Sequence, residues 1–161
     1  MVANDNNGQI DIFLKDLKTG EITLVSANGS AEGFNGNSYG VALSADGTKV
    51  LFNSDANNAA ISDTNNVTDA FIKDLTTGEI TRVSTDSGDK EVQGSAIVAV
   101  GMSADGTKVL LQSNSANLVF GDNNDAYDVF VKDLKTGTVT RVNTNYEDTE
   151  ANGDSEGYAI S

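Results

Sequence analysis

The chain repeats itself, and this repeat limits the possible folds more than any other feature of the sequence. Residues 43–51 (LSADGTKVL) return as residues 102–110 (MSADGTKVL), a shift of 59. A second block at 11–22 returns at 69–80 and again at 128–139, at shifts of 58 and 59. A fixed period of this length is typical of proteins that stack copies of one small structural unit. The 161 residues hold about two and three-quarter repeats.

Each complete repeat is predicted to form four short strands. In the first complete unit we expect them at 39–43, 49–53, 70–74 and 79–84, where Val, Ile, Phe and Thr are enriched. Asp-Gly and Thr-Gly turns join the strands in pairs, and Gly supplies the positive φ that tight turns need. The third strand is a continuous apolar run, which indicates burial on both faces. The first strand has small residues at alternate positions, so one of its faces is expected to pack closely against a neighbour.

Four-stranded antiparallel sheets that repeat at a fixed period, with a crowded first strand, are typical of β-propeller blades. A β-sandwich is the alternative, but it needs neither the regular repeat nor the recurring small residues. We therefore predict an all-β fold of β-propeller blades in an incomplete ring. The expected units are a half blade at 1–30 (third and fourth strands), full blades at 31–89 and 90–148, and the first strand of a next blade at 149–161.

The size of the repeat also bears on assembly. A ring of at least four such units needs more than about 200 residues. The chain is therefore expected to be part of a longer propeller, or a homo-oligomer whose copies join head to tail as a ring or a filament.

The repeat resembles that of the TolB-like propeller family. The likeness rests on the turn Ser44-Ala45-Asp46-Gly47, followed by Asp-x-Phe-x-Lys-Asp-Leu-x-Thr-Gly from Asp69, and it covers nearly the whole chain. Two features depart from the family pattern: Ala replaces the usual Pro after Ser44, and the repeat is longer. The extra residues lie mainly between the second and third strands. The resemblance implies a propeller fold and says little about function.

These extra residues contain the candidate site. A segment with the pattern Asp-x-Asn-x-x-x-Asp precedes each third strand. Ca²⁺ binds about six to eight oxygen atoms from carboxylates, amides, carbonyls and water, so the Asp and Asn positions are candidate ligands. They are Asp5, Asn7 and Asp11; Asp63, Asn65 and Asp69; and Asp122, Asn124 and Asp128. The segments also resemble the shortened EF-hand-like calcium loops of some extracellular propellers, which implies Ca²⁺ as a cofactor bound with weak, extracellular-type affinity.

Plain turns are the alternative interpretation of the same segments, because Asn and Asp side chains accept hydrogen bonds from nearby backbone N–H groups without any metal. Two observations favour a metal. The two acids keep a fixed spacing in all three copies, and the chain has a formal charge of −14 with only 10 Lys and Arg residues to offset its acids.

Other charged residues recur at fixed positions, and for each we expect a structural role. The acids before the Thr-Gly turns are expected to accept hydrogen bonds within the hairpin: Asp16, Asp74 and Asp133. The lysines that end the third strands are expected to be solvated or paired with acids: Lys15, Lys73 and Lys132. The arginines of the fourth, outer strand are expected to discourage edge-to-edge pairing: Arg82 and Arg141. The four tyrosines are expected to be packing residues.

Composition narrows the functional classes. The chain has no His and no Cys, so Ser-His-Asp, Cys-His and zinc-thiolate sites are absent. A charge of −14 disfavours nucleic acid as a partner, and no apolar run is long enough to span a membrane.

The sequence thus predicts a non-enzymatic, calcium-stabilised module for protein binding or self-assembly. It is expected to be extracytoplasmic, secreted or at the cell surface, with its export signal outside this chain. A carbohydrate-binding, lectin-like propeller is one alternative, although the chain has no Trp. An accessory propeller domain from a larger secreted hydrolase is the other.

Overall fold

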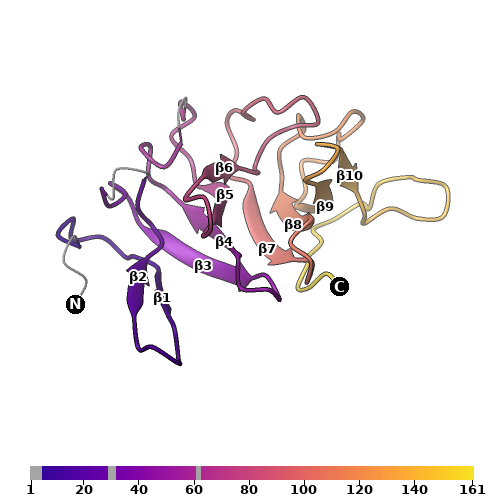
Figure 1. The fold of residues 1–161 in the computed structure, drawn as a ribbon. Helices are drawn as coiled ribbons and strands as arrows, with labels where there is room; N and C mark the ends of the chain where they lie inside the picture. Colours follow the sequence, from indigo (N-terminus) through magenta and orange to yellow (C-terminus); the bar gives the residue numbers. More distant parts are fainter. Residues whose placement is uncertain (1–4, 29–31, 61–62) are drawn as a thin grey trace.

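In the computed structural model, all residues except 1–4, 29–31 and 61–62 are described, and the described residues form ten strands and no helix. The strands make three antiparallel sheets (Figure 1). Sheet 1 pairs β1 (Phe13–Lys15) with β2 (Ile22–Leu24). Sheet 2 has the order β3 (Ser38–Leu43), β4 (Lys49–Ser54), β5 (Asp69–Asp74) and β6 (Ile80–Arg82). Sheet 3 repeats this order with β7 (Val98–Met102), β8 (Lys108–Ser113), β9 (Asp128–Asp133) and β10 (Val139–Arg141).

The prediction of an all-β chain with four-stranded antiparallel sheets is confirmed. Three of the four strands predicted for the first complete repeat match β3, β4 and β5 to within one residue at each end. The fourth strand is shorter than predicted and ends at Arg82. The terminal segment 149–161 contains no strand, although Glu150 forms an isolated bridge with Thr144.

The Asp-Gly turns are held by the Asp side chain. Asp46 Oδ1 accepts hydrogen bonds from Ser44 Oγ at 2.6 Å and from the Thr48 N–H at 3.0 Å, while Gly47 has φ of 72°. The bond from Ser44, then those from Thr48, lower the pKa of Asp46 to about 2. The same bonds recur around Asp105. The acids before the Thr-Gly turns also accept backbone N–H groups within their hairpins, as predicted.

The lowered pKa of Asp46 leads to a prediction for Asp46→Asn. Because the folded-state pKa lies below the usual 3.8, the ionised side chain stabilises the fold above about pH 4, and this contribution is lost as the pH falls towards 2. The wild type should therefore be more stable than Asp46→Asn at neutral pH, and the difference should shrink between about pH 4 and pH 2. Urea denaturation of both proteins across this range measures it; a difference that does not vary with pH would contradict the role of the ionised Asp46.

The three sheets follow one another across the molecule, so that β1 and β2 lie at the opposite end from sheet 3 (Figure 1). The first strands of sheets 2 and 3, β3 and β7, contact each other. Asn53 on β4 links the same two sheets: its Nδ2 donates to Ala99 O at 2.9 Å, and its Oδ1 accepts from the Ala99 N–H at 2.8 Å.

The small residues pack closely at sheet 3, as predicted, but not in β3, where Gly40 is exposed and an added Cβ would meet only Ile12 Cγ2, at 3.8 Å. A Cβ on Gly101 of β7 would lie 3.5 Å from the Cα of Ala159 in the C-terminal segment. A Cβ on Gly157 in that segment would lie 2.9 Å from Leu110 Cδ2 and 3.0 Å from Val129 Cγ1, too close for a side chain without rearrangement. Residues 157–159 thus lie against sheet 3 at the place in the repeat that corresponds to the first strand of a further unit.

The apolar core lies between neighbouring sheets. Phe34, Phe52 and Phe71 are fully buried between sheets 1 and 2, with ring centroids 5.9 Å and 5.6 Å apart along the row. A second cluster joins sheets 2 and 3 and includes Val83 and Phe130. β5 and β9 are largely buried on both faces, as their apolar runs predicted, whereas Phe13 at the equivalent place in β1 is 44% exposed.

Not all aromatic side chains pack inside. The expectation that the tyrosines are packing residues is wrong, because all four are among the exposed large side chains: Tyr39, Tyr127, Tyr146 and Tyr158.

The described residues include no helix that is long and apolar enough to cross a bilayer.

The core geometry predicts the effect of Phe71→Ala. Loss of this fully buried ring leaves a cavity beside Phe52, so the free energy of unfolding should fall by about 3–5 kcal/mol. Phe120→Ala is the control, since the Phe120 side chain is fully exposed. Urea denaturation should show little change for the control; equal losses in the two variants would contradict the assignment of the core.

Candidate metal centre

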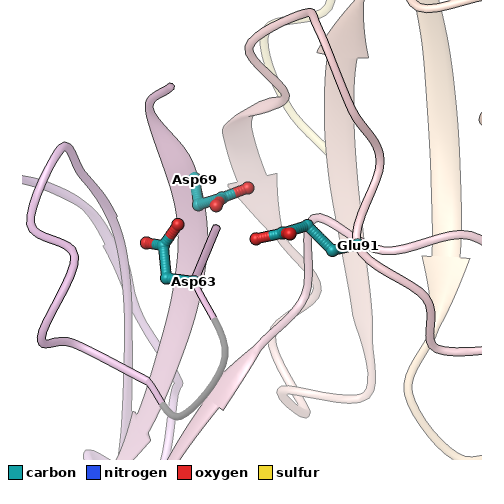
Figure 2. A group of neighbouring side chains, drawn as sticks. All are labelled: Asp63, Asp69 and Glu91. Atoms are coloured by element: carbon teal, nitrogen blue, oxygen red, sulfur yellow. The ribbon is translucent and has the colours of Figure 1, made fainter. Parts of the chain in front are cut away.

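Carboxylates from three separate segments of one repeat meet at each candidate site. Asp63 begins the loop before β5, Asp69 is the first residue of β5, and Glu91 follows β6. One oxygen from each lies within 4.8 Å of the others. Figure 2 shows the three carboxylates turned toward one another. Asp122, Asp128 and Glu150 form the same group in the next repeat. Oxygens bound to one Ca²⁺ lie at most about 5 Å apart, so this spacing suits a single cation.

An arginine reaches into each group. Arg82 of β6 pairs with Asp69 at 3.4 Å and with Glu91, and its side chain is only 9% exposed. Arg141 of β10 lies 2.6 Å from Glu150, 3.3 Å from Asp128 and 3.6 Å from Asp122. The expected role of these arginines on an outer edge is therefore wrong. Their side chains turn inward because buried carboxylates, and not solvent, are the available partners.

The arginines offset only part of the negative charge. With all groups ionised, three carboxylates and one guanidinium leave a net charge of −2 in each group. Burial raises the pKa of Asp63 and Asp69 in spite of Arg82, and burial together with the charge of Asp128 raises the pKa of Asp122. Burial acts on Glu91 in the same direction, but bonds from Thr64 and Arg82 outweigh it and lower its pKa to about 2. Asp63, Asp69 and Asp122 are thus the carboxylates whose ionised form the surroundings disfavour.

Buried carboxylate oxygens without hydrogen-bond partners mark the same groups. They are Asp63 Oδ1 in one group and Asp122 Oδ2 in the other; Asp11 Oδ2 of the first repeat also lacks a partner, but it lies outside any group of three acids among the described residues. The side chain of Asp122 is only 2% exposed. A buried carboxylate oxygen that lacks a partner costs free energy, and a bound cation would remove that cost. The donor set therefore fits a hard divalent cation.

The Asn at the third loop position fastens the loop. Asn65 Oδ1 accepts the Val67 N–H at 3.1 Å, and its Nδ2 donates to Val92 O and Asp69 Oδ2, both at 3.2 Å. Asn124 makes the equivalent bonds, with Ala151 O at 2.9 Å. These bonds are those of an Asx-turn, and they direct a nitrogen at the acids. Within the described groups, the Glu of the same repeat provides the third carboxylate beside the two Asp residues.

The loop turns sharply at its fourth position. Asn66 and Asp125 have φ of 55° and 53°, and Gly8 at the same place in the first repeat has φ of 72°. Gly, Asn and Asp are the residues that tolerate this left-handed conformation best. The turn brings the first and seventh positions of the loop to the same side. Asp125 itself is exposed and lies outside the acidic group.

The first repeat differs from the other two. Asp11 Oδ1 accepts Ser26 Oγ at 2.5 Å, and Asn7 Nδ2 donates to Phe34 O at 2.9 Å, as their counterparts do. However, Leu24 stands where the other repeats have Arg82 and Arg141, and Gly33 stands where they have Glu91 and Glu150. Asp5 and Asp11 do not join a group of three acids among the described residues. Each repeat thus has either both the Arg and the Glu or neither of them.

Sequence reasoning found Asp63, Asp69, Asp122 and Asp128 and missed Glu91 and Glu150. The glutamates lie 22 residues beyond the loop in an irregular segment, so spacing within the loop does not reveal them. A signal was nevertheless present: Glu91 and Glu150 are 59 residues apart, as are Arg82 and Arg141, and this is the period of the repeat.

No known family model matches this chain, and no relative is found among curated proteins. The assignment of a function therefore depends on the geometry of the repeats and of their acidic groups.

The paired Arg and Glu predict a test by substitution. In Arg82→Leu, the buried Asp69 and the half-buried Asp63 and Glu91 lose the one cation that the described residues place among them, so in the presence of EDTA the free energy of unfolding should fall by about 3–5 kcal/mol. Adding Glu91→Gln, which approaches the composition of the first repeat, should recover part of the loss. Urea denaturation compares the variants. A double variant no more stable than Arg82→Leu would contradict the view that the acids destabilise one another.

Proposed function

We propose that this chain is a non-enzymatic, calcium-stabilised β-propeller module that acts in protein binding or self-assembly outside the cytoplasm. The observation that carries the proposal is the pair of equivalent acidic groups, each with a buried carboxylate oxygen that has no hydrogen-bond partner: Asp63 in one and Asp122 in the other.

The arrangement of the sheets supports the propeller. Sheets 2 and 3 have the same order of four antiparallel strands, and their first strands contact each other. Residues 157–159 then lie beside β7. In a propeller, the first strand of every blade lies next to the central axis and the outer strands lie further from it. Sheet 1 corresponds to the outer two strands of such a blade.

Calcium would act on the long loop of each repeat. Asp63 and Asp69 or Asp122 and Asp128, together with the Glu of the same group, would hold the ion by their oxygens. The bound charge would offset the net −2 that remains beside the arginine. The ion would then hold the loop against the start of the third strand, which is β5 or β9, and against the segment that follows the fourth strand of the same sheet. Each repeat can bind independently, since all of its ligands come from within 29 consecutive residues.

The chemistry of the described residues supports a structural role. The strongly acidic groups lie beside arginines that compensate them, and no His or Cys occurs anywhere in the chain. Weak calcium sites of this kind suit a compartment rich in calcium, which favours an extracellular location. The exposed apolar side chains at both ends of the molecule, Phe13 and Val142 among them, support a role in association.

A thermal melt with Ca²⁺ and with EDTA tests the cation site. For a dissociation constant of about 10⁻⁴–10⁻³ M, Ca²⁺ at about 10 mM should stabilise the fold by about 1.4–2.7 kcal/mol per site. This corresponds to a rise in Tm of about 3–10 °C per site. Identical melts in Ca²⁺ and in EDTA would contradict the proposed role of calcium.

Substitutions locate the effect. Asp122→Asn should remove about half of the calcium-dependent rise, and the double variant Asp63→Asn/Asp122→Asn should remove nearly all of it. Asp125→Asn is the matched control, because Asp125 stands in the same loop, is exposed, and lies outside the acidic group. If Asp125→Asn lost as much of the calcium-dependent rise in Tm as Asp122→Asn, calcium would be responding to the overall charge of the loop and not to the proposed site.

A further inference from the structure

We propose that sheet 1 of one copy docks onto sheet 3 of a second copy through the same lysine and apolar contacts that join successive sheets within the chain. This inference rests on the proposed role in self-assembly and assigns to it a partner, a second copy of this chain, and the residues at the contact.

A lysine on the third strand of each four-stranded sheet reaches the sheet before it. Lys73 Nζ of β5 donates to Val25 O at 2.8 Å and to Ala27 O at 2.7 Å, both just after β2. Lys132 Nζ of β9 donates to Thr85, to Asp86 O at 3.3 Å and to Asp89 Oδ1 at 3.1 Å, just after β6. Lys132 is 3% exposed, and burial lowers its pKa. Neither lysine is simply solvated, so the repeated lysine is a contact between sheets.

The two charged residues of a third contact of this kind, Lys15 and Asp148, are both exposed. Lys15 stands on β1 where Lys73 and Lys132 stand on their strands, and it is exposed. At the other end of the molecule, Thr144 and Asp148 correspond to Thr85 and Asp89. Among the described residues no lysine bonds to either of them, and Asp148 is exposed with the same positive φ, 56°, as Asp89. The backbone at Asp148 thus already has the conformation that Asp89 has in the formed contact.

The apolar part of the contact is exposed in the same way. Val25 is 0% exposed and clusters with Phe71 of the next sheet; Val83 is 1% exposed and clusters with Phe130. Their counterparts at the two ends of the chain are Val142, 47% exposed, and Phe13, 44% exposed. A second copy that places Phe13 on Val142 would bury both side chains, as each internal contact does.

The charges are complementary as well. Lys15 would meet the carboxylate of Asp148, as Lys132 meets Asp89. The two surfaces are different parts of the chain, so a pair of copies joined by this contact retains one free surface of each kind. Such a head-to-tail contact closes a ring where the rotation permits and otherwise grows as a filament.

The experiment measures the mass of the purified chain by light scattering and sedimentation over a wide range of concentration. The wild type should associate as its concentration rises. Lys15→Asp removes the docking lysine, and Val142→Asp places a charge on the acceptor surface; each should weaken association by about tenfold or more. Lys18→Asp is the matched control for Lys15→Asp, because it changes the same charge at an exposed turn outside the contact.

Mixing the two variants separates this contact from any other. A Lys15→Asp chain keeps a working sheet 3 surface, and a Val142→Asp chain keeps a working sheet 1 surface. Together they should form a dimer and nothing larger, while each alone remains a monomer. Circular dichroism confirms that both variants fold. A wild type that stays monomeric, a Lys15→Asp chain that associates like the wild type, or a mixture that stays monomeric would overturn the proposal.

The same measurements in Ca²⁺ and in EDTA distinguish this proposal from the calcium site. Association without any calcium-dependent rise in Tm would support the contact and contradict the cation site, and the reverse result would do the opposite.

Discussion

The structure depends on the packing of each third strand against the sheet that precedes its own. A four-stranded sheet of 3- to 6-residue strands has two faces, and its apolar third strand needs cover on both. Neighbouring sheets supply this cover: Phe71 lies in a row with Phe34 and Phe52, and Phe130 shares a cluster with Val83. Where the chain provides no neighbour, as at Phe13, the equivalent side chain remains 44% exposed. The repeat thus makes each unit dependent on the unit before it.

The buried charges follow from the same constraint. Lys73 and Lys132 lose much of their hydration where they cross between sheets, and backbone carbonyls at the end of a fourth strand replace the lost water. Within each repeat, Arg82 and Arg141 lie among three acids whose loops would otherwise repel one another. The lysines connect the units and the arginines close the loops. The two kinds of cation therefore have separate roles, and they lie on different strands: the lysines on the third strand of each sheet and the arginines on the fourth.

Much of the fold and two of the three acids in each acidic group could be predicted from the sequence. The strand positions, the Asp-Gly turns and the double burial of β5 and β9 follow from local pattern, because turn residues and apolar runs act over a few residues. The two Asp residues of each loop follow from their fixed spacing. Glu91 could not be predicted from its surroundings, since it approaches Asp63 only after β5 and β6 have paired and returned the chain to the loop. The exposure of the Tyr side chains could not be predicted either, because no sequence pattern indicates that Tyr146 is exposed.

The sequence by itself determined the period, the number and order of strands in each complete repeat, and the points at which the chain must turn, because these depend on residues close together in the chain. Tertiary structure alone decided where the charged side chains point. Arg82 was expected to face solvent and is buried against Glu91, and Lys132 is buried against the preceding sheet. Such positions depend on which groups the folded chain places within a few ångströms of one another, and a charge removed from water must find its partner there.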